Sequence, residues 1–414
     1  MTHSPATAGQ LLRGIHDVGR DLRRGGYSRF AYGAAELDLR EWFVAEAARR
    51  SMDTETDRNG VLWAWLPGPG DSCEQAVVTG SHLDSVPGGG EFDGPLGVAS
   101  AFAAVDLLRA RGFTADRALA IVAFPEEEGG RFGQACLGSQ LMTGAMDADR
   151  ALRLRDADGI SLAEALAGAG IDPAHVGRDD EAIRRIGAFV ELHVEQGRGL
   201  VDLGEPVAIG SSIIGHGLWR LTVAGQGNHA GATRMTERRD PVVAAGAIVV
   251  AARDAARAVK DARVTVGRIE PTPGGTNVIA SCVDVWLDVR HPDDAEVVTL
   301  VAAIADRARV VAAAEGCEVT LVEESYGGSV RFDRPLRDRL AAVLPDAPHL
   351  DAGAGHDAGV LAGVVPTAML FTRNPTGISH APQEQVEDAD AQSGAAALAD
   401  VLQDLLRSES PRRV

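Results

Sequence analysis

Residues 80–102, GSHLDSVPGGGEFDGPLGVASAF, place a histidine and a carboxylate in glycine-rich chain directly after an apolar segment. The two groups are His82 and Asp93. The preceding residues AVVT predict a buried strand, and LGVASAFAAVDLLRARG predicts a helix. A strand that ends in polar residues and leads into a helix indicates an α/β domain, where ligands bind beyond the carboxyl ends of the strands.

Four later segments share this pattern of His, Glu or Asp beside glycine at the end of a predicted strand. A single histidine is more often a hydrogen-bonded structural residue than a ligand, but five segments of one pattern favour a common pocket. Together they predict a metal site that the fold assembles from PEEEGGRFG (125–133), ELHVEQG (191–197), GAGHDAG (353–359) and GISHAPQE (377–384).

The composition limits the class of protein. A chain of 414 residues exceeds what one hydrophobic core usually serves, so two domains are expected. The net charge of −19 argues against nucleic acid or an anionic membrane as a partner. Neither a signal peptide nor a membrane-spanning apolar run is recognisable, and the four cysteines lack the spacing of a zinc site or a disulfide scaffold. We expect a soluble, cytoplasmic protein with no membrane partner.

Strands and helices alternate in the first half of the chain. Strand patterns at 61–68, 76–82 and 118–124 are separated by helical patterns, including 96–112. This alternation predicts an α/β fold with a largely parallel sheet and helices on both faces, that is, an α/β/α sandwich.

The pattern changes near residue 213. The predicted elements then follow the order βαββαβ, which indicates a small antiparallel sheet with two helices on one face, a ferredoxin-like domain. We therefore assign residues 1–212 and 329–414 to a catalytic domain and residues 213–328 to an inserted domain.

The residue types at the strand ends suit divalent metals. Neutral imidazole and carboxylate bind Zn²⁺, Mn²⁺ or Co²⁺, and one carboxylate can bridge two ions about 3.5–4 Å apart. Asp93 is the candidate bridge. Because adjacent glutamates on a turn point in different directions, Glu128 can ligate a metal while Glu127 acts as general base toward the water that the metals activate.

Other residues of these segments have candidate roles. His193 and His380 complete two sets of ligands, and Asp84 is expected to orient the His82 imidazole through its second nitrogen. The alternative interpretation of EEE (126–128) is a solvated charge run. The alternative interpretation of HVE (193–195) is the ordinary alternation of a strand. His356 and Asp357 are interpreted as supporting or helix-capping groups rather than ligands.

The ordered motifs resemble one known family. Together with GNHAGATRM (227–235) and GGTNVIAS (274–281), they are similar to the hydantoinase/carbamoylase amidases of the M20 metallopeptidase superfamily. That family includes N-carbamoyl-L-amino acid hydrolases, β-ureidopropionases and allantoate amidohydrolases. The resemblance runs from the GGYSRFAY segment to the final helical pattern, so it covers nearly the whole chain.

The resemblance implies two metal ions per subunit. His82, Asp93 and His193 would hold one ion, and the other would be held by Asp93 with Glu128 and His380. Glu127 would be the base. Related M20 peptidases are similar except for a carboxylate at the position of His193, so this histidine favours the amidase branch.

The inserted domain resembles the family's lid and dimerisation domain. The resemblance implies that His229 stabilises the oxyanion from the partner subunit, that Asn277 and Arg290 hold the substrate carboxylate, and that Gln196 lies near the ureido group. The alternative for His229 is a turn residue. For Arg290 the alternative is a surface ion pair with Asp288 or Asp293.

These inferences predict a homodimeric, two-metal amidohydrolase that releases ammonia and carbon dioxide from a ureido acid, either allantoate or an N-carbamoyl-L-amino acid. The alternative is an M20 aminoacylase or dipeptidase that cleaves an N-acyl amino acid or a dipeptide. Nothing in the sequence supports a homologue that has lost catalysis. Two departures from the family pattern, Ala352 and Arg373-Asn374, leave the identity of the ureido acid open, and the physiological metal is open too.

Overall fold

The computed structural model describes residues 5–407. The chain divides into two compact units. One is formed by the chain up to Ser212 and from Arg331 onward, and the other by Ile213–Val330. Within residues 5–407 no helix is both long enough and apolar enough to cross a lipid bilayer.

The first unit is built on a mixed sheet of nine strands among the described residues, ordered β1-β2-β4-β3-β5-β15-β6-β13, with β14 paired to β6. The four central strands β4, β3, β5 and β15 are parallel, but the pairs β1–β2, β2–β4 and β15–β6 are antiparallel. The prediction of a largely parallel sheet is therefore confirmed for the four central strands, and the antiparallel flanking strands add to it. The strands are β1 (Asp53–Thr56), β2 (Leu62–Leu66), β3 (Ala76–His82), β4 (Leu119–Phe124), β5 (Ile186–Val194), β6 (Val207–Ile213), β13 (Val330–Arg331), β14 (His349–Ala352) and β15 (Thr367–Thr372).

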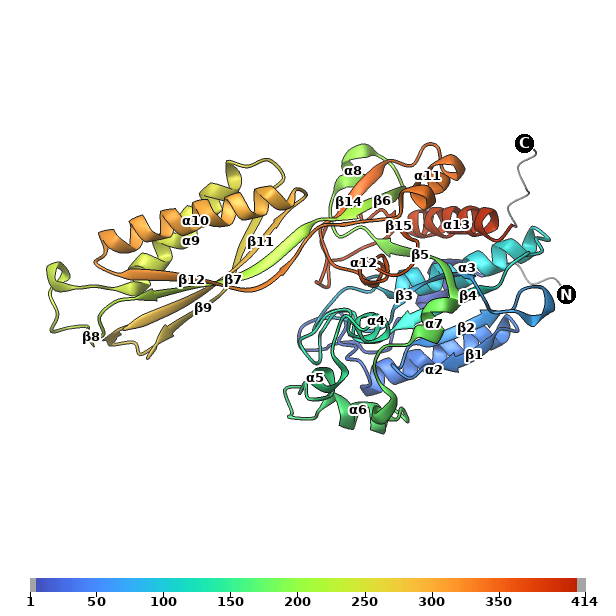
Figure 1. Cartoon of the computed structure of the whole chain (residues 1–414), viewed down its shortest axis with the longest axis horizontal. Helices are drawn as coiled ribbons and strands as arrows, with labels where there is room; N and C mark the ends of the chain where they lie inside the picture. The colour runs from blue at the N-terminus through green and yellow to red at the C-terminus, as the bar shows by residue number, and fades with distance from the viewer. Residues whose placement is uncertain (1–4, 408–414) are drawn as a thin grey trace. The chain divides into compact units, whose positions relative to one another are not determined.

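Helices of the first unit cover the sheet, as Figure 1 shows for α3 and α13 beside the central strands. α3 starts at Pro95, a residue whose fixed φ suits the first helical position, and it is mainly small and apolar, so nearly its whole surface is buried. α4 and α12 pack against each other, and α12 also contacts β5 and β15. The helices are α1 (Ala8–Arg13), α2 (Ala34–Arg49), α3 (Pro95–Ala110), α4 (Leu137–Thr143), α5 (Ala148–Leu152), α6 (Leu162–Gly168), α7 (Asp180–Arg185), α8 (Gly199–Leu203), α11 (Arg334–Val343), α12 (Asp357–Leu361) and α13 (Asp388–Leu405).

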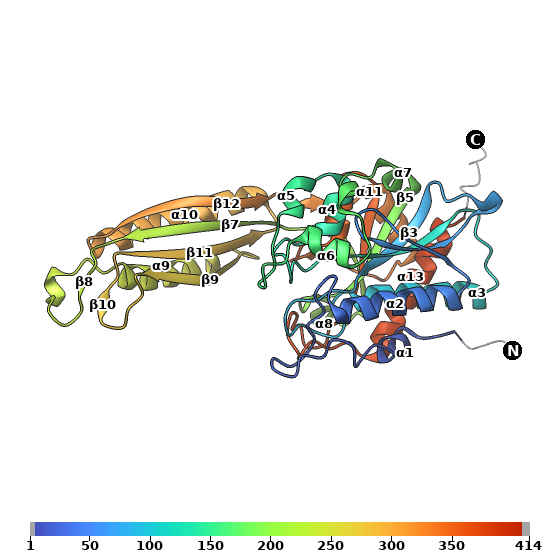
Figure 2. The same ribbon diagram turned by 90° about the horizontal axis from the view of Figure 1, so that it is seen from below.

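The second unit contains an antiparallel sheet in the order β12-β7-β11-β9. Alternate residues of β7 and β11 are buried, and they form one core with α9 and α10, so both helices cover the same face (Figure 2). A short ribbon pairs β8 with β10. Apart from the short ribbon of β8 (Asn228–His229) and β10 (Val278–Ile279), the elements follow the order βαββαβ. They are β7 (Gly215–Ala224), α9 (Pro241–Arg257), β9 (Arg263–Thr272), β11 (Cys282–His291), α10 (Asp294–Ala314) and β12 (Glu318–Gly327).

The register of the central strands brings distant motifs to one edge. His82, the last residue of β3, is paired with Phe124, the last residue of β4. On the other side of β3, His193 of β5 is paired with Phe371 of β15. Since these strands are parallel, their carboxyl ends lie at the same edge, and the loops that follow them can share a site.

Candidate active site

The first unit gathers His82, Asp93, Glu128, His193 and His380 at this edge. Among the described residues, three groups have donor atoms within 4.8 Å of one another: Glu191, His193 and His356 form one of them, and the other two are His82, Asp93 and His193, and Asp93, Glu128 and His380. The last two share Asp93. These are the two ligand sets that the sequence predicted.

Asp93 presents one carboxylate oxygen to each set. Its Oδ1 lies 3.2 Å from Nε2 of His193 and 3.7 Å from Nε2 of His82. Its Oδ2 lies 3.5 Å from Nε2 of His380, and that nitrogen is 3.2 Å from Oε2 of Glu128. A carboxylate with one oxygen toward each donor set has the arrangement that a bridge between two metals needs.

Unsatisfied polar atoms indicate what kind of group the cluster fits. Nε2 of His82, Nε2 of His193 and Oε1 of Glu128 are buried without a hydrogen-bond partner among residues 5–407. Buried polar atoms are normally paired, and an unpaired group in a native structure calls for an explanation such as an ion. Imidazole nitrogens aimed at a carboxylate fit Zn²⁺, Mn²⁺ or Co²⁺.

The three consecutive glutamates point in three directions, as the turn predicted. Glu126 has a left-handed backbone (φ 53°), and its Oε1 accepts a hydrogen bond from the backbone N–H of Arg131 in the same turn. Glu127 points into the cluster, with Oε2 3.6 Å from Nε2 of His82. Glu128 faces His380. The run is therefore not a solvated charge run.

Burial determines the protonation chemistry of Glu127. Its side chain is 5% exposed, and burial raises the pKa of its carboxyl well above the usual range, while His82 opposes this. Its Oε1 is 3.8 Å from Sγ of Cys136 and 3.8 Å from Nδ1 of His356. A carboxyl with a raised pKa is matched to taking up and returning a proton near neutral pH.

Asp84 makes different contacts from those expected. Its backbone carbonyl, and not its carboxylate, lies at hydrogen-bonding distance (3.1 Å) from Nδ1 of His82, and the nearest carboxylate oxygen is 3.6 Å away. Its carboxylate instead accepts the backbone N–H groups of Glu127 and Glu128, each at 3.1 Å. Asp84 therefore orients the imidazole through its main chain and fixes the glutamate turn through its side chain.

Gln196 lies against the cluster. Its Nε2 donates to Oδ2 of Asp93 at 3.0 Å, and it is 3.4 Å from Nε2 of His380. The predicted role beside a ureido group stays a prediction.

Two buried residues of the cluster, Glu191 and Cys136, were not singled out by the sequence. Glu191 is fully buried and accepts hydrogen bonds from Ser81 and from the backbone N–H of Ala358. The sequence feature that could have identified Glu191 as a residue of the site is its alternation with His193 in ELHVEQG. His356, interpreted from the sequence as a supporting or helix-capping group, occupies the N-cap position of α12 without a side-chain capping hydrogen bond, and its ring lies 4.4 Å from that of His193. No sequence pattern marks Cys136 as a residue of the site, because only the fold brings its thiol close to Glu127.

His229, Asn277 and Arg290 belong to the second unit. His229 lies on exposed β8, and its Nδ1 accepts the backbone N–H groups of Gly231 and Ala232, each at 3.1 Å. In the neutral ring the proton is then on Nε2, which makes that nitrogen a donor. The turn role and the donor role are therefore compatible.

Asn277 is exposed, and Arg290 lies on β11. The Arg290 guanidinium donates to both carboxylate oxygens of Asp288, at 2.8 and 2.7 Å. The ion pair foreseen as the alternative thus exists. Contact between these residues and a substrate stays a prediction.

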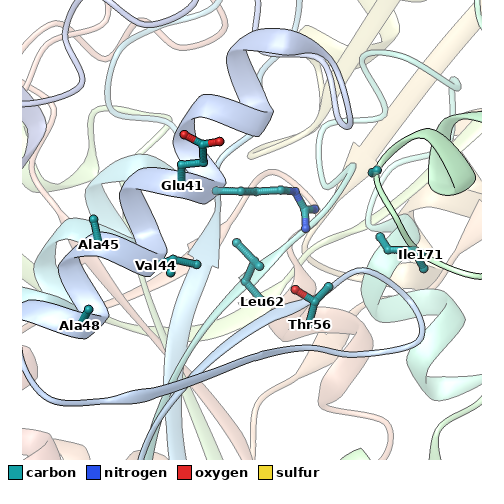
Figure 3. Close-up of a pocket in the computed structure, with 9 residues that line it drawn as sticks. Glu41, Val44, Ala45, Ala48, Thr56, Leu62 and Ile171 are labelled. Carbon is teal, nitrogen blue, oxygen red and sulfur yellow. The ribbon is translucent and has the colours of Figure 1, made fainter.

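A separate hollow lies elsewhere in the first unit. It has a volume of about 390 Å³ and lies beside α2 (Figure 3). None of the predicted site residues lines this hollow. The candidate site is therefore identified by its metal-donor side chains and not by the hollow. The lining residues are Arg40, Glu41, Val44, Ala45, Ala48, Thr56, Leu62, Ala169 and Ile171.

Comparison with known proteins identifies the family of the chain. Residues 78–404 match the profile described as "Peptidase family M20/M25/M40". The chain is 36% identical to an N-carbamoyl-L-amino acid amidohydrolase of Geobacillus stearothermophilus, with 97% of this chain and 98% of that protein covered. It is 30% identical to the allantoate amidohydrolase of Escherichia coli (strain K12), with 98% and 99% covered.

A solved structure gives the same result. An amidase of the hydantoinase/carbamoylase family from Burkholderia multivorans has a TM-score of 0.84 at 30% identity, and 96% of this chain and 98% of that chain are covered. The chain therefore belongs to the metal-dependent peptidase family M20/M25/M40. Within it, the chain is an amidase of the hydantoinase/carbamoylase type, a hydrolase of carbon–nitrogen bonds other than peptide bonds.

Proposed function

We propose that this chain is a homodimeric, two-metal amidohydrolase that hydrolyses the ureido bond of a small ureido acid, allantoate or an N-carbamoyl-L-amino acid. The products would be ammonia, carbon dioxide and the remaining acid. The observation that carries the proposal is the division of the Asp93 carboxylate between two donor sets, with Glu127 in the same cluster. Relatives whose names specify these substrates support the substrate class.

The two ions would be held by His82, Asp93 and His193 and by Asp93, Glu128 and His380. Bound divalent ions supply Lewis-acid activation of water and of the attacked carbonyl.

The protein's own residues would do the rest. Glu127 takes the proton of the attacking water and returns it to the leaving nitrogen, for which its buried carboxyl is suited. His229, contributed by the partner subunit, donates from Nε2 to the developing oxyanion. Arg290 and Asn277 bind the substrate carboxylate, for which a guanidinium offers a planar fork. Binding of the carboxylate would position the ureido carbon for attack.

The substrate test is ammonia release by protein loaded with Mn²⁺, with and without chelator. The panel contains allantoate, several N-carbamoyl-L-amino acids, 3-ureidopropionate and an acetyl amino acid. Chelator-sensitive ammonia release from one ureido acid is the expected result. Activity on the acetyl compound alone, scored by free amine, would select the aminoacylase alternative and contradict the proposal.

The roles of the two glutamates are tested as a pair. Glu127→Gln is expected to abolish turnover and to keep both metal ions, because a base is lost but no ligand. Glu128→Gln is expected to lose metal as well as activity. Metal content measured on the purified variants separates the two cases, and loss of metal from Glu127→Gln would refute the role assigned to Glu127.

A further inference from the structure

The loop between β15 and α13 carries His380 in an uncommon backbone conformation. His380 has a left-handed backbone (φ 56°), which is uncommon for a residue with a side chain, and its side chain is 48% exposed. Such a conformation persists only where the surrounding structure fixes it. The hydrogen bonds of the loop must therefore supply the constraint.

Asn374 fixes the loop from within. Its side chain is fully buried, and its Nδ2 donates to the carbonyl of Ile378 at 2.8 Å. Its Oδ1 accepts the backbone N–H groups of Thr376 and Gly377, each at 3.1 Å, and the Thr376 hydroxyl at 2.8 Å. One amide thus closes the chain that leads to His380. In the sequence, Asn374 stands out only as part of a departure from the family pattern.

Glu384 ties the same loop to the segment that carries Asp93. It is 6% exposed, and its Oε1 accepts the backbone N–H groups of Phe92 and Asp93, both at 3.0 Å. Its Oε2 lies 3.2 Å from the hydroxyl of Ser379, and that hydroxyl is 3.0 Å from Oδ2 of Asp93. The carboxylate therefore fixes the backbone of one ligand candidate and the neighbour of another.

The fit around Glu384 is close. A Cβ atom on Gly90 would lie 2.1 Å from Oε1 of Glu384, so the backbone of the Asp93 segment approaches the carboxylate as far as a glycine allows. A contact of this kind connects two loops that are almost 300 residues apart, and no local sequence pattern encodes it.

We propose that Asn374 and Glu384 are positioning residues of the metal centre, with different reach. Asn374 acts through the loop of His380 and so serves chiefly the metal ion that His380 would hold. Glu384 acts through Asp93, which both donor sets share, and so serves both ions. The inference rests on the proposed two-metal centre and assigns neither residue a contact with the substrate.

The test is the stoichiometry and affinity of Mn²⁺ binding, measured by titration of metal-free protein followed by metal analysis. Loss of a group that orients a metal ligand typically lowers metal affinity about 10–100-fold. Asn374→Ala is expected to show this loss for one ion and to keep the affinity for the other. Glu384→Ala is expected to lower the affinity for both ions. Gln385→Ala, an exposed neighbour, is the control and should bind two ions as the unaltered chain does.

Conservative variants keep the test decisive if an alanine variant fails to fold. Glu384→Gln keeps an oxygen that can accept the N–H groups of Phe92 and Asp93, so it should restore most of the affinity. Asn374→Asp keeps the acceptor but places a carboxylate oxygen against the carbonyl of Ile378, so it should weaken one ion only.

Two results would overturn the inference. The first is that Asn374→Ala or Asn374→Asp binds two Mn²⁺ ions with unaltered affinity. The second is that a change at Asn374 lowers the affinity for both ions equally, which would indicate a general structural role. If the unaltered chain binds fewer than two ions, the two-metal proposal itself fails, and the inference fails with it. The titration of the unaltered chain therefore separates the two failures.

Discussion

Replacing Gly94 by alanine is expected to disable the cluster through His82, although no donor group is changed. A Cβ atom at position 94 would lie 2.4 Å from Cε1 and 2.5 Å from Nδ1 of His82. Carbon atoms in contact are about 3.5–4.0 Å apart, so the imidazole has to move by about 1 Å or the backbone has to shift. His82 is fully buried, and its Nδ1 contacts the carbonyl of Asp84, so the surroundings oppose the movement.

The magnitude follows from two contributions. Forcing an extra methyl group into a packed interior costs about 1–3 kcal/mol. The backbone of Gly94 has φ 88° and ψ −60°, outside the left-handed helical region, and a side chain in such a sparsely populated conformation costs about 1–3 kcal/mol more. The free energy of unfolding should fall by roughly 2–6 kcal/mol in total. Displacement of a ligand imidazole should also lower metal affinity by at least about 10–100-fold.

Gly112 provides the matched control. It has φ 65°, and nothing lies within 4 Å of an added Cβ atom, so Gly112→Ala carries only the backbone cost of about 1–2 kcal/mol. Urea unfolding and Mn²⁺ titration of both variants are the assays. Equal losses of unfolding free energy in the two variants, with unaltered Mn²⁺ affinity in Gly94→Ala, would refute the reasoning.

Three further outcomes are expected. Arg290→Ala should lower kcat/KM by roughly 10–150-fold, because a hydrogen bond to a charged group contributes about 1.5–3 kcal/mol. The control is Arg220→Ala, which breaks an ion pair with Glu324 on the same sheet and should leave kcat/KM unchanged. Unchanged steady-state kinetics would contradict the assignment of Arg290. Chelation should lower the Tm, because an ion at 100 times its Kd contributes about 2.7 kcal/mol. A calorimetric scan that is unaffected by chelator would contradict a metal at the cluster. Apparent Mn²⁺ affinity should rise with pH, since hydrogen bonding to Glu128 raises the pKa of His380 to about 9 and the metal must displace that proton. Titrations at two pH values measure this, and equal affinity at both would count against His380 as a ligand.

The sequence predicted the parts of the site that local pattern encodes. Apolar runs followed by Gly with His or Asp place strand ends, and parallel strands bring their ends to one edge, so the nearness of His82 to Asp93 and Glu127 could be foreseen. The flanking antiparallel strands were not foreseen. Strand direction depends on pairing partners such as β2 with β4, and a short apolar run carries no information about them.

The direction of individual side chains was harder to predict. Asp84 was expected to face His82, because a carboxylate two residues from a histidine often does. In the structure its carboxylate turns to the N–H groups of Glu127 and Glu128, which the left-handed turn at Glu126 presents. The choice depends on backbone donors that belong to a different strand end, and spacing along the chain cannot show them.

The sequence by itself determined the family, the α/β character of the first unit and the βαββαβ order of the second, because each depends on ordered motifs and local periodicity. Only the tertiary structure decided that Asp93 gives one oxygen to each donor set, and that Asn374 and Glu384 brace the loop of His380. Those contacts join residues that are distant in the chain, and they are selected by the geometry of strand register and hydrogen bonding rather than by residue type.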